Sequence, residues 1–394
     1  MEQALARGRR CLIAALVALG AASGAGRAQN PPSDVGSHVA VIGVATVERD
    51  AGPDGLPVGG LSGIDYDPAS GDWYMISDDK SEFGPARMLR ARVDFDNDRP
   101  LSVRLLSVIP LRREDGRTFP PQGTGTEASD AESVRVIPGG KGLIWSSEGD
   151  AKDGFGPAVR RAGLDGASLG KLSLPSSFAF DPLGKHGPRP NLSIEGLTFT
   201  NRGRKLWLSL EAPLQQDGDL ARAATGAVVR FTQLAFPSGR LLRQVAYPVE
   251  PIGPFPSGRL ADNGVSEILA LDSRHLLVIE RSGIENDEHD FGFRARVYCA
   301  LLNHAQDVAT LASLRDGKVQ PVRKALAIDF SKVPGTRIDN VEGMTLGPRL
   351  SNGHGSLVFI TDNDFSPRRK TQVIALEVMA PATPKAMAHA LCGE

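Results

Sequence analysis

The stretch Asn191-Leu-Ser-Ile-Glu-Gly-Leu-Thr-Phe-Thr200 is followed by the short polar segment Asn201-Arg-Gly-Arg204 and then by Lys205-Leu-Trp-Leu-Ser-Leu-Glu-Ala212. Two apolar runs around a glycine-containing turn are typical of two antiparallel strands. Glu195 stands where the first strand begins, and Glu211 stands where the second ends. Because these two ends of a hairpin lie on the same side, the pattern predicts two carboxylates at one edge of a sheet.

The same pattern occurs five times along the chain. The corresponding positions are spaced 63 to 75 residues apart, at Ser62, Glu132, Glu195, Glu267 and Glu342. A spacing of this size holds four short strands with their connections, so each repeat predicts one four-stranded sheet. Sheets of this kind are buried on both faces when they stack radially, which predicts an all-β fold, a β-propeller.

Five blades follow from this count. The last repeat supplies only three strands, at 342–346, 356–362 and 371–378, and an isolated strand at 39–47 is expected to complete that blade and close the ring. A six-bladed ring is the alternative if the segment 309–330 forms a degenerate blade.

The N-terminus resembles a secretory signal peptide. Arg7, Arg9 and Arg10 precede an apolar run at 11–22, and small residues follow up to Ala28, where cleavage is expected. Arg9-Arg10 also fits a twin-arginine export signal. We therefore expect residues 1–28 to be removed and 29–394 to form a single domain in the periplasm or outside the cell, with a core at about 38–380 and a tail at 381–394.

Composition narrows the partners. The formal net charge of the 394 residues is -1, which gives no electrostatic reason to expect nucleic acid or an acidic membrane surface, and the mature protein is expected to be a monomer. Two cysteines remain after cleavage, Cys299 and Cys392. In an oxidising compartment they form either a disulfide or two free thiols.

The repeats bring acidic residues to one face of the ring. In a propeller the start of each first strand meets the end of the second strand, so the strand starts named above converge there with the strand ends Asp78/Asp79, Glu148, Glu211, Glu280 and Asp362/Asp364. Hard oxygen ligands at this density suit Ca²⁺, with Mg²⁺ as the alternative. Arg87, Arg281 and Arg368 are candidate counter-charges. The alternative to a metal site is that these acidic residues only cap turns, and Asp362-Asn363-Asp364 is equally typical of a turn.

The ordered set of motifs resembles the phytase-like domain of the "esterase-like activity of phytase" family. The segments that carry this resemblance include Ile194-Glu-Gly-Leu-Thr-Phe199, Gly264-Val-Ser-Glu-Ile268, Asn340-Val-Glu-Gly-Met-Thr345 and Ile360-Thr-Asp-Asn-Asp364, and it spans about residues 41–378. The sequence departs from the pattern at Ser62 and at Ser133, which follows Glu132. The resemblance implies ester hydrolysis, and distant propeller relatives imply calcium held by carboxylates.

These observations lead to one hypothesis and two alternatives. We expect a calcium-dependent hydrolase of small phosphate or carboxylate esters in which either Glu211 or Glu280 is the general base and Arg281 stabilises developing negative charge. The expected metal ligands are Glu132, Glu195, Glu267, Glu342, Asp362, Asn363 and Asp364. The alternatives are a non-catalytic binding protein with a structural cation, and a lactonase.

Overall fold

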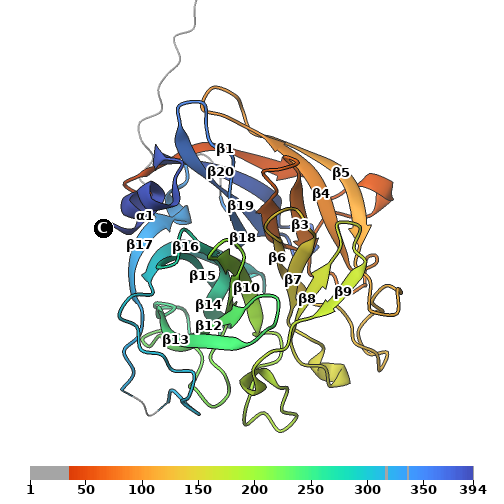
Figure 1. Ribbon diagram of the computed structural model, residues 1–394, viewed down its shortest axis with the longest axis vertical. Helices are drawn as coiled ribbons and strands as arrows, with labels where there is room; N and C mark the ends of the chain where they lie inside the picture. The colour runs from red at the N-terminus through yellow and green to blue at the C-terminus, as the bar shows by residue number, and fades with distance from the viewer. Residues whose placement is uncertain (1–34, 316–317, 335–336, 394) are drawn as a thin grey trace, which may run out of the picture. The chain divides into compact units, whose positions relative to one another are not determined.

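Five four-stranded antiparallel sheets surround a common axis (Figure 1). The computed structural model describes residues 35–315, 318–334 and 337–393, which belong to one compact unit. The prediction of an all-β, five-bladed propeller is confirmed. The six-bladed alternative is wrong, because the segment 309–330 forms no sheet of its own and instead supplies the last strand of the fourth blade.

The blades follow one another along the chain. Blade 1 consists of β2 (Leu61–Tyr66), β3 (Trp73–Ser77), β4 (Arg87–Asp94) and β5 (Ser102–Pro110). Blade 2 consists of β6 (Ala131–Val136), β7 (Leu143–Ser147), β8 (Ala158–Ala162) and β9 (Ser168–Lys171). Blade 3 consists of β10 (Ile194–Thr200), β11 (Lys205–Leu210), β12 (Ala227–Ala235) and β13 (Leu241–Val249). Blade 4 consists of β14 (Ala261–Ala270), β15 (His275–Glu285), β16 (Phe291–Leu301) and β17 (Arg323–Asp329). Blade 5 consists of β18 (Asn340–Leu346), β19 (His354–Asp362), β20 (Thr371–Pro381) and β1 (Val39–Val47).

The ring is closed by the two ends of the described chain. Strand β1 pairs antiparallel with β20, in a register that runs from Val39 opposite Val378 to Val47 opposite Thr371. The first strands of neighbouring blades, β2, β6, β10, β14 and β18, contact one another in succession and β18 contacts β2. The N-terminal strand therefore completes blade 5, as predicted, and the five first strands line the central channel.

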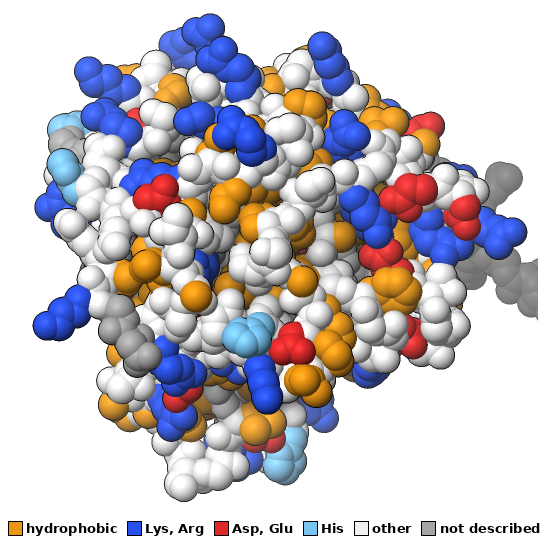
Figure 2. Space-filling view, turned by 60° about the horizontal axis from the view of Figure 1, so that its bottom comes forward, with side chains coloured by type: hydrophobic (Ala, Val, Ile, Leu, Met, Phe, Trp, Pro, Cys, Tyr) orange, Lys and Arg blue, Asp and Glu red, His pale blue; other side chains and the backbone are white. Residues whose placement is uncertain are grey.

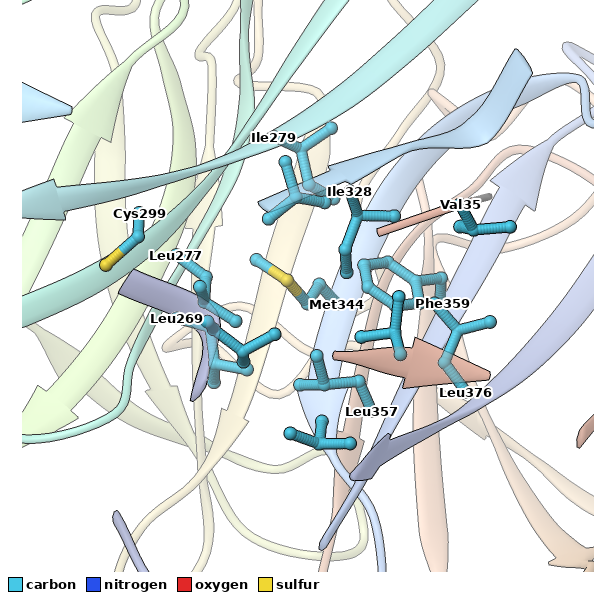
Figure 3. Close-up of a cluster of buried hydrophobic side chains, with 14 of the residues drawn as sticks. Val35, Leu269, Leu277, Ile279, Cys299, Ile328, Met344, Leu357, Phe359 and Leu376 are labelled. Atoms are coloured by element: carbon cyan, nitrogen blue, oxygen red, sulfur yellow. The ribbon is translucent and has the colours of Figure 1, made fainter. Parts of the chain in front are cut away.

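Apolar side chains fill the spaces between blades. Figure 3 shows one such cluster, in which Leu269 and Leu277 of blade 4 face Met344, Leu357 and Phe359 of blade 5. All five are buried, and burying a side chain of this size stabilises the fold by about 1.5–3 kcal/mol. Because each blade is covered on both faces, its inner strands are apolar almost throughout rather than in strict alternation.

The C-terminal tail packs onto this cluster through a helix that the sequence analysis did not predict. Helix α1 (Pro384–Cys392) begins after Thr383, whose side chain accepts a hydrogen bond from the backbone of Ala386, and it buries Met387 and Leu391. Cys392 forms a disulfide with Cys299 of β16, the first of the two alternatives considered above. The described part of the chain also contains four short 3-10 helices, at Pro53–Gly55, Ala151–Asp153, Ser176–Phe178 and Phe330–Lys332.

The expected signal peptide, 1–28, lies outside the described residues. Within the described part of the chain, no helix combines the length and the apolar character needed to cross a membrane. On the face shown in Figure 2, Lys and Arg side chains lie mainly around the margin and apolar side chains nearer the centre.

Candidate functional site

Each first strand carries a β-bulge near its start. The register shifts between Ile194 and Gly196 in blade 3, and between Val341 and Gly343 in blade 5, so Glu195 and Glu342 have no direct partner on the next strand. A bulge re-aims the side chain of the extra residue. The equivalent bulge residues of blades 1, 2 and 4 are Ser62, Glu132 and Ser266.

The ends of the second strands form a second set of equivalent positions. Asp362 pairs with Asn340 and Arg281 pairs with Gly264, and both partners lie two residues before the bulge residue of their strand. Backbone hydrogen bonds to the same step of the first strand define the other three, which are Asp78, Glu148 and Glu211. Four blades therefore have a carboxylate at this position, and blade 4 has an arginine.

Both sets open into one cavity of about 300 Å³, which we call the funnel cavity. Ten carboxylates and three cations line it. The carboxylates are Asp78, Asp130, Glu132, Glu148, Glu195, Glu211, Asp262, Glu342, Asp362 and Asp364, and the cations are Lys80, Arg281 and Arg369. Of the predicted site residues, Glu132, Glu195, Glu211, Arg281, Glu342, Asp362 and Asp364 thus lie together.

Glu267 does not reach the funnel cavity, contrary to the expectation from the repeat. Its neighbour Ser266 is the bulge residue, so Glu267 occupies the position of Gly196 and points elsewhere. Its carboxylate is fully buried and pairs with Arg135 at 2.8 Å, and it accepts hydrogen bonds from the Ser133 hydroxyl and the Leu197 amide. Glu267 is therefore a partner of Arg135 inside the channel.

Glu280 is likewise displaced by one residue from the predicted set. It pairs with Val265, the residue just before the bulge, whereas Arg281 holds the position that faces the cavity. Its carboxylate accepts hydrogen bonds from the Tyr247 hydroxyl at 2.7 Å and from the Glu250 amide, and it forms an ion pair with Lys324. These contacts lie between blades 3 and 4, so Glu280 is not placed to act as a base in the cavity.

Asn363 has a local role. Its side-chain oxygen accepts hydrogen bonds from the Phe365 amide at 2.9 Å and the Gly60 amide at 3.3 Å, which fixes the turn after β19. The turn interpretation of this triplet thus fits Asn363. Of the other candidate counter-charges, Arg87 is buried against Asp79 at 2.5 Å, and Arg368 lines a neighbouring cavity.

Several residues of the funnel cavity were missing from the predicted set. Asp130 stands immediately before β6 and forms a 2.9 Å ion pair with Lys80, which also donates to the Asn191 side chain. Phe291 and Arg369 reach the cavity from outer segments of blades 4 and 5. For Asp130 the position two residues before the bulge was a usable signal. Phe291 and Arg369 do not stand at a position that recurs in the five repeats, so the repeat gave no signal for them.

Arg281 is the best-connected cation of the cavity. Its guanidinium lies 2.8 Å from a Glu211 oxygen, 3.7 Å from Glu342 and 3.9 Å from Asp262, and it packs over the ring of Phe293. These acids raise the pKa of Arg281 despite its burial, so it stays charged. Arg281 therefore offsets part of the negative charge on the blade 3 and blade 5 side.

Glu195 and Asp362, by contrast, form no ion pair with a lysine or arginine of the described chain. Burial raises the pKa of Glu195 well above its ordinary value, and the Glu132 and Glu148 carboxylates raise it further. Burial also raises the pKa of Asp362, with Asp78 adding to the effect. For Glu211, burial raises the pKa to about 7 against the opposing effect of Arg281. Like charges held this closely call for a cation.

The donor set fits a metal ion. Among the described residues, three groups of carboxylates have ligand oxygens that all lie within 4.8 Å of one another, namely Asp78/Asp362/Asp364, Asp130/Glu132/Glu148 and Glu148/Glu195/Glu211. One oxygen of the buried Asp362 has no hydrogen-bond partner in the described chain, and neither has the amide oxygen of Asn340. Unmatched buried oxygens beside clustered carboxylates are suited to a metal ion that accepts several oxygen ligands.

The raised pKa values predict how stability depends on pH without metal. A carboxyl whose pKa is higher in the folded protein, such as Glu211 at about 7 against 4.5 ordinarily, stabilises the fold below the ordinary value and loses this effect as pH rises through 7. For the metal-free protein, prepared with a chelator, we expect the melting temperature to fall by on the order of 5–10 °C between pH 5.5 and pH 8. Thermal unfolding followed by circular dichroism measures this. A flat or rising profile would contradict it.

Two solved structures show distant similarity to the chain. The catalytic domain of a Coprinopsis cinerea GH62 α-L-arabinofuranosidase is 11% identical over 85% of this chain and 97% of its own, with a TM-score of 0.38. An exo-1,5-α-L-arabinanase from a bovine ruminal metagenomic library is 9% identical over 82% of this chain and 93% of its own, with a TM-score of 0.37. These similarities are too distant to bear on substrate or mechanism. No curated protein sequence matches the chain.

The family comparison is direct. The model of the Phytase-like family, described as "Esterase-like activity of phytase", matches residues 56–365. This range runs from the loop before blade 1 to the turn after β19, and it includes every bulge and every second-strand end that faces the funnel cavity. The chain therefore belongs to the Phytase-like family.

Proposed function

We propose that this protein is an exported, Ca²⁺-dependent hydrolase of small phosphate or carboxylate esters. The observation that carries the proposal is the funnel cavity, where three groups of carboxylates, two of them fully buried, converge from four blades beside one fixed arginine. Membership of a family described by esterase-like activity supports the reaction class.

Calcium is the ion that suits these ligands best. Ca²⁺ takes six to eight oxygen ligands in flexible geometry, whereas Mg²⁺ demands a near-ideal octahedron and keeps several waters. Glu148 belongs to two of the three groups, so it would join a site with Asp130 and Glu132 to a site with Glu195, with Glu211 beside the ion and kept for proton transfer. When bound there, calcium supplies polarisation of a phosphoryl or carbonyl oxygen and acidification of water.

The protein's own groups supply proton transfer and charge stabilisation. Glu211, which lines the funnel cavity, would take a proton from the attacking water as the water oxygen bonds to phosphorus or carbon, and would return that proton to the alcohol oxygen of the ester as the ester bond breaks. Arg281, 2.8 Å from Glu211, is placed to stabilise negative charge that develops on the ester oxygen. Of the two bases expected from the sequence, we propose Glu211, because it lines the funnel cavity.

The proposed location follows from the N-terminal sequence. A signal peptide at 1–28 would direct the chain to the periplasm or beyond, where the Cys299–Cys392 disulfide is stable. There the protein would act as a monomer on a small-molecule substrate.

The test is turnover of aryl phosphates, aryl esters and lactones with calcium and with a chelator. We expect hydrolysis of at least one ester class in calcium, a loss of at least 100-fold in the chelator, and a similar loss in Glu211→Gln because a positioned base contributes about 10²–10⁴-fold. Glu288→Gln, at an exposed loop position, is the matched control and should keep wild-type activity. Turnover that survives both the chelator and Glu211→Gln would refute the proposal. Calcium that stabilises the protein without any turnover would favour the binding protein instead.

A further inference from the structure

We propose that a second cavity beside the funnel cavity binds an anionic group, so that the substrate of this protein carries an anion in addition to the ester that is cleaved. We call this cavity the basic annex. It measures about 260 Å³, and its charged lining residues are Arg337, Arg368, Arg369, Lys370, Asp290 and Asp339. The proposal rests on the proposed function for the identity of the substrate, but the anion site itself does not.

The two cavities adjoin. Arg369 and Phe291 line both of them, so these two side chains form the wall between the funnel cavity and the basic annex. One small molecule can therefore reach from the carboxylates of the funnel cavity across this wall. The loop between β19 and β20 contributes to both cavities, since Asp364 lines the funnel cavity and residues 368–370 line the basic annex.

The charge of the basic annex is opposite to that of the funnel cavity. Four cations and two carboxylates line the annex, whereas three cations and ten carboxylates line the funnel cavity. A site built for a cation and a site built for an anion thus lie side by side. Guanidinium and ammonium groups bind phosphate, sulfate and carboxylate through charge-assisted hydrogen bonds, which makes an anionic substituent the matching ligand.

Arg369 is held rigidly in the dividing wall. Its guanidinium pairs with Asp364 on the funnel side and with Asp290 on the annex side, and it stacks 4.8 Å over the ring of Phe293. Its side chain is only 10% exposed, and its Nε has no hydrogen-bond partner among the described residues. A fixed, buried donor with an unused N–H is a feature of a binding site rather than of a solvated surface.

The net positive charge comes from the mouth of the annex. Because Arg369 is paired with two acids, Arg368 and Lys370 provide the charge that a ligand would meet first, and both are exposed. Asp339 is half-buried beside the Lys370 backbone and opposes anion binding in part, so the affinity for a single small anion is expected to be modest. A ligand anchored at both cavities gains from each contact without a second loss of translational freedom.

Direct binding tests the annex without any turnover. Inorganic sulfate is titrated by calorimetry into the full chain, in calcium and in a chelator. We expect saturable binding in the millimolar range in both, and at least a fivefold loss of affinity in the double variant Arg368→Gln/Lys370→Gln. Lys141→Gln removes an exposed charge from the β6–β7 turn and should leave binding unchanged. The proposal would be overturned if the wild type and the double variant bound sulfate equally. It would also be overturned if sulfate behaved as an adventitious ion only, bound equally by all variants.

Kinetics tests the link to the substrate. An aryl monophosphate is compared with the corresponding aryl bisphosphate. We expect the bisphosphate to have a KM about tenfold lower, and Arg368→Gln/Lys370→Gln to remove this difference by raising its KM while kcat is unchanged. If the double variant changes both substrates equally, the annex does not hold the second anion. If neither substrate is turned over while sulfate binds as expected, the proposed function fails and the anion site stands.

Discussion

Replacing Glu148 by Gln is expected to weaken calcium binding by on the order of 100-fold or more and, at the same time, to stabilise the calcium-free protein. Glu148 belongs to two of the three carboxylate groups, so its loss removes a ligand from both. Its pKa is raised well above the ordinary value by burial and by the Asp130 and Glu211 carboxylates, which means that its charge destabilises the fold when no cation is bound.

The two effects have opposite signs, and this makes the result diagnostic. A glutamine side chain keeps the oxygen that accepts a hydrogen bond from the Ser193 amide, so the backbone contact is preserved while the charge is lost. We expect the free energy of unfolding in a chelator to rise by about 1–2 kcal/mol at pH 7.5. Calorimetric titration with calcium gives the affinity, and denaturant unfolding in a chelator gives the stability.

The matched control is the same substitution at Glu267. This carboxylate is as deeply buried but pairs with Arg135 and lies outside the funnel cavity. Glu267→Gln should therefore leave calcium affinity unchanged and destabilise the protein, because a buried guanidinium loses its partner. If Glu148→Gln instead binds calcium like the wild type, or is less stable than the wild type in a chelator, Glu148 is not a ligand in a repulsive cluster.

The fold could be predicted because its signal is repeated. Five copies of one hairpin pattern, with an unpaired strand at 39–47, determine the number of blades and the closure of the ring. The helix at Pro384–Cys392 gave no such signal, since a short segment rich in alanine and proline forms a helix here only through a cap and through packing onto the blade 4 and blade 5 cluster.

The site could be predicted only in part, because a β-bulge changes which residue faces the cavity. Matching glutamates by type aligned Glu267 with Glu195, whereas strand pairing aligns Ser266 with Glu195 and Arg281 with Glu211. One residue of displacement turns a side chain to the other face of a strand. A further clue is that glycine follows the bulge in three blades, where a Cβ at Gly196 would lie only 2.7 Å from the Ile268 amide of the next blade.

Arg135 gives the second large prediction, because its guanidinium joins several blades inside the channel. It extends from β6 of blade 2 and donates to the carbonyls of Leu197 in blade 3 at 2.6 Å, Ile64 in blade 1 at 2.8 Å and Ile268 in blade 4 at 3.0 Å. It also forms ion pairs with Glu267 at 2.8 Å and with Asp65 at 3.8 Å. One side chain thus satisfies backbone acceptors from three neighbouring first strands.

Arg135→Met is expected to lower the free energy of unfolding by about 3–5 kcal/mol, since it leaves the buried Glu267 carboxylate unpaired and three buried carbonyls without a donor. Arg135→Met/Glu267→Met should recover part of this loss, because it removes the uncompensated charge but not the unmatched carbonyls. Denaturant unfolding of the two single variants, the double variant and the wild type gives the coupling energy between the two residues.

The dependence on pH separates the charge from the carbonyl contacts. Burial raises the pKa of Glu267 to about 7 in the wild type, although Arg135 opposes this shift. Without Arg135, the folded protein tolerates Glu267 only in its protonated form over a wider range of pH. The folded-state pKa is then higher still, and stability is lost as pH rises through it. Arg135→Met should therefore be closest to the wild type near pH 5 and fall further behind toward pH 8, whereas the deficit of the double variant should grow less steeply, because Asp65 is then the only one of the two carboxyl partners still lacking the guanidinium. A single-variant deficit below about 1 kcal/mol at pH 7.5 would mean that water replaces the guanidinium in the channel and that Arg135 does not hold the blades together.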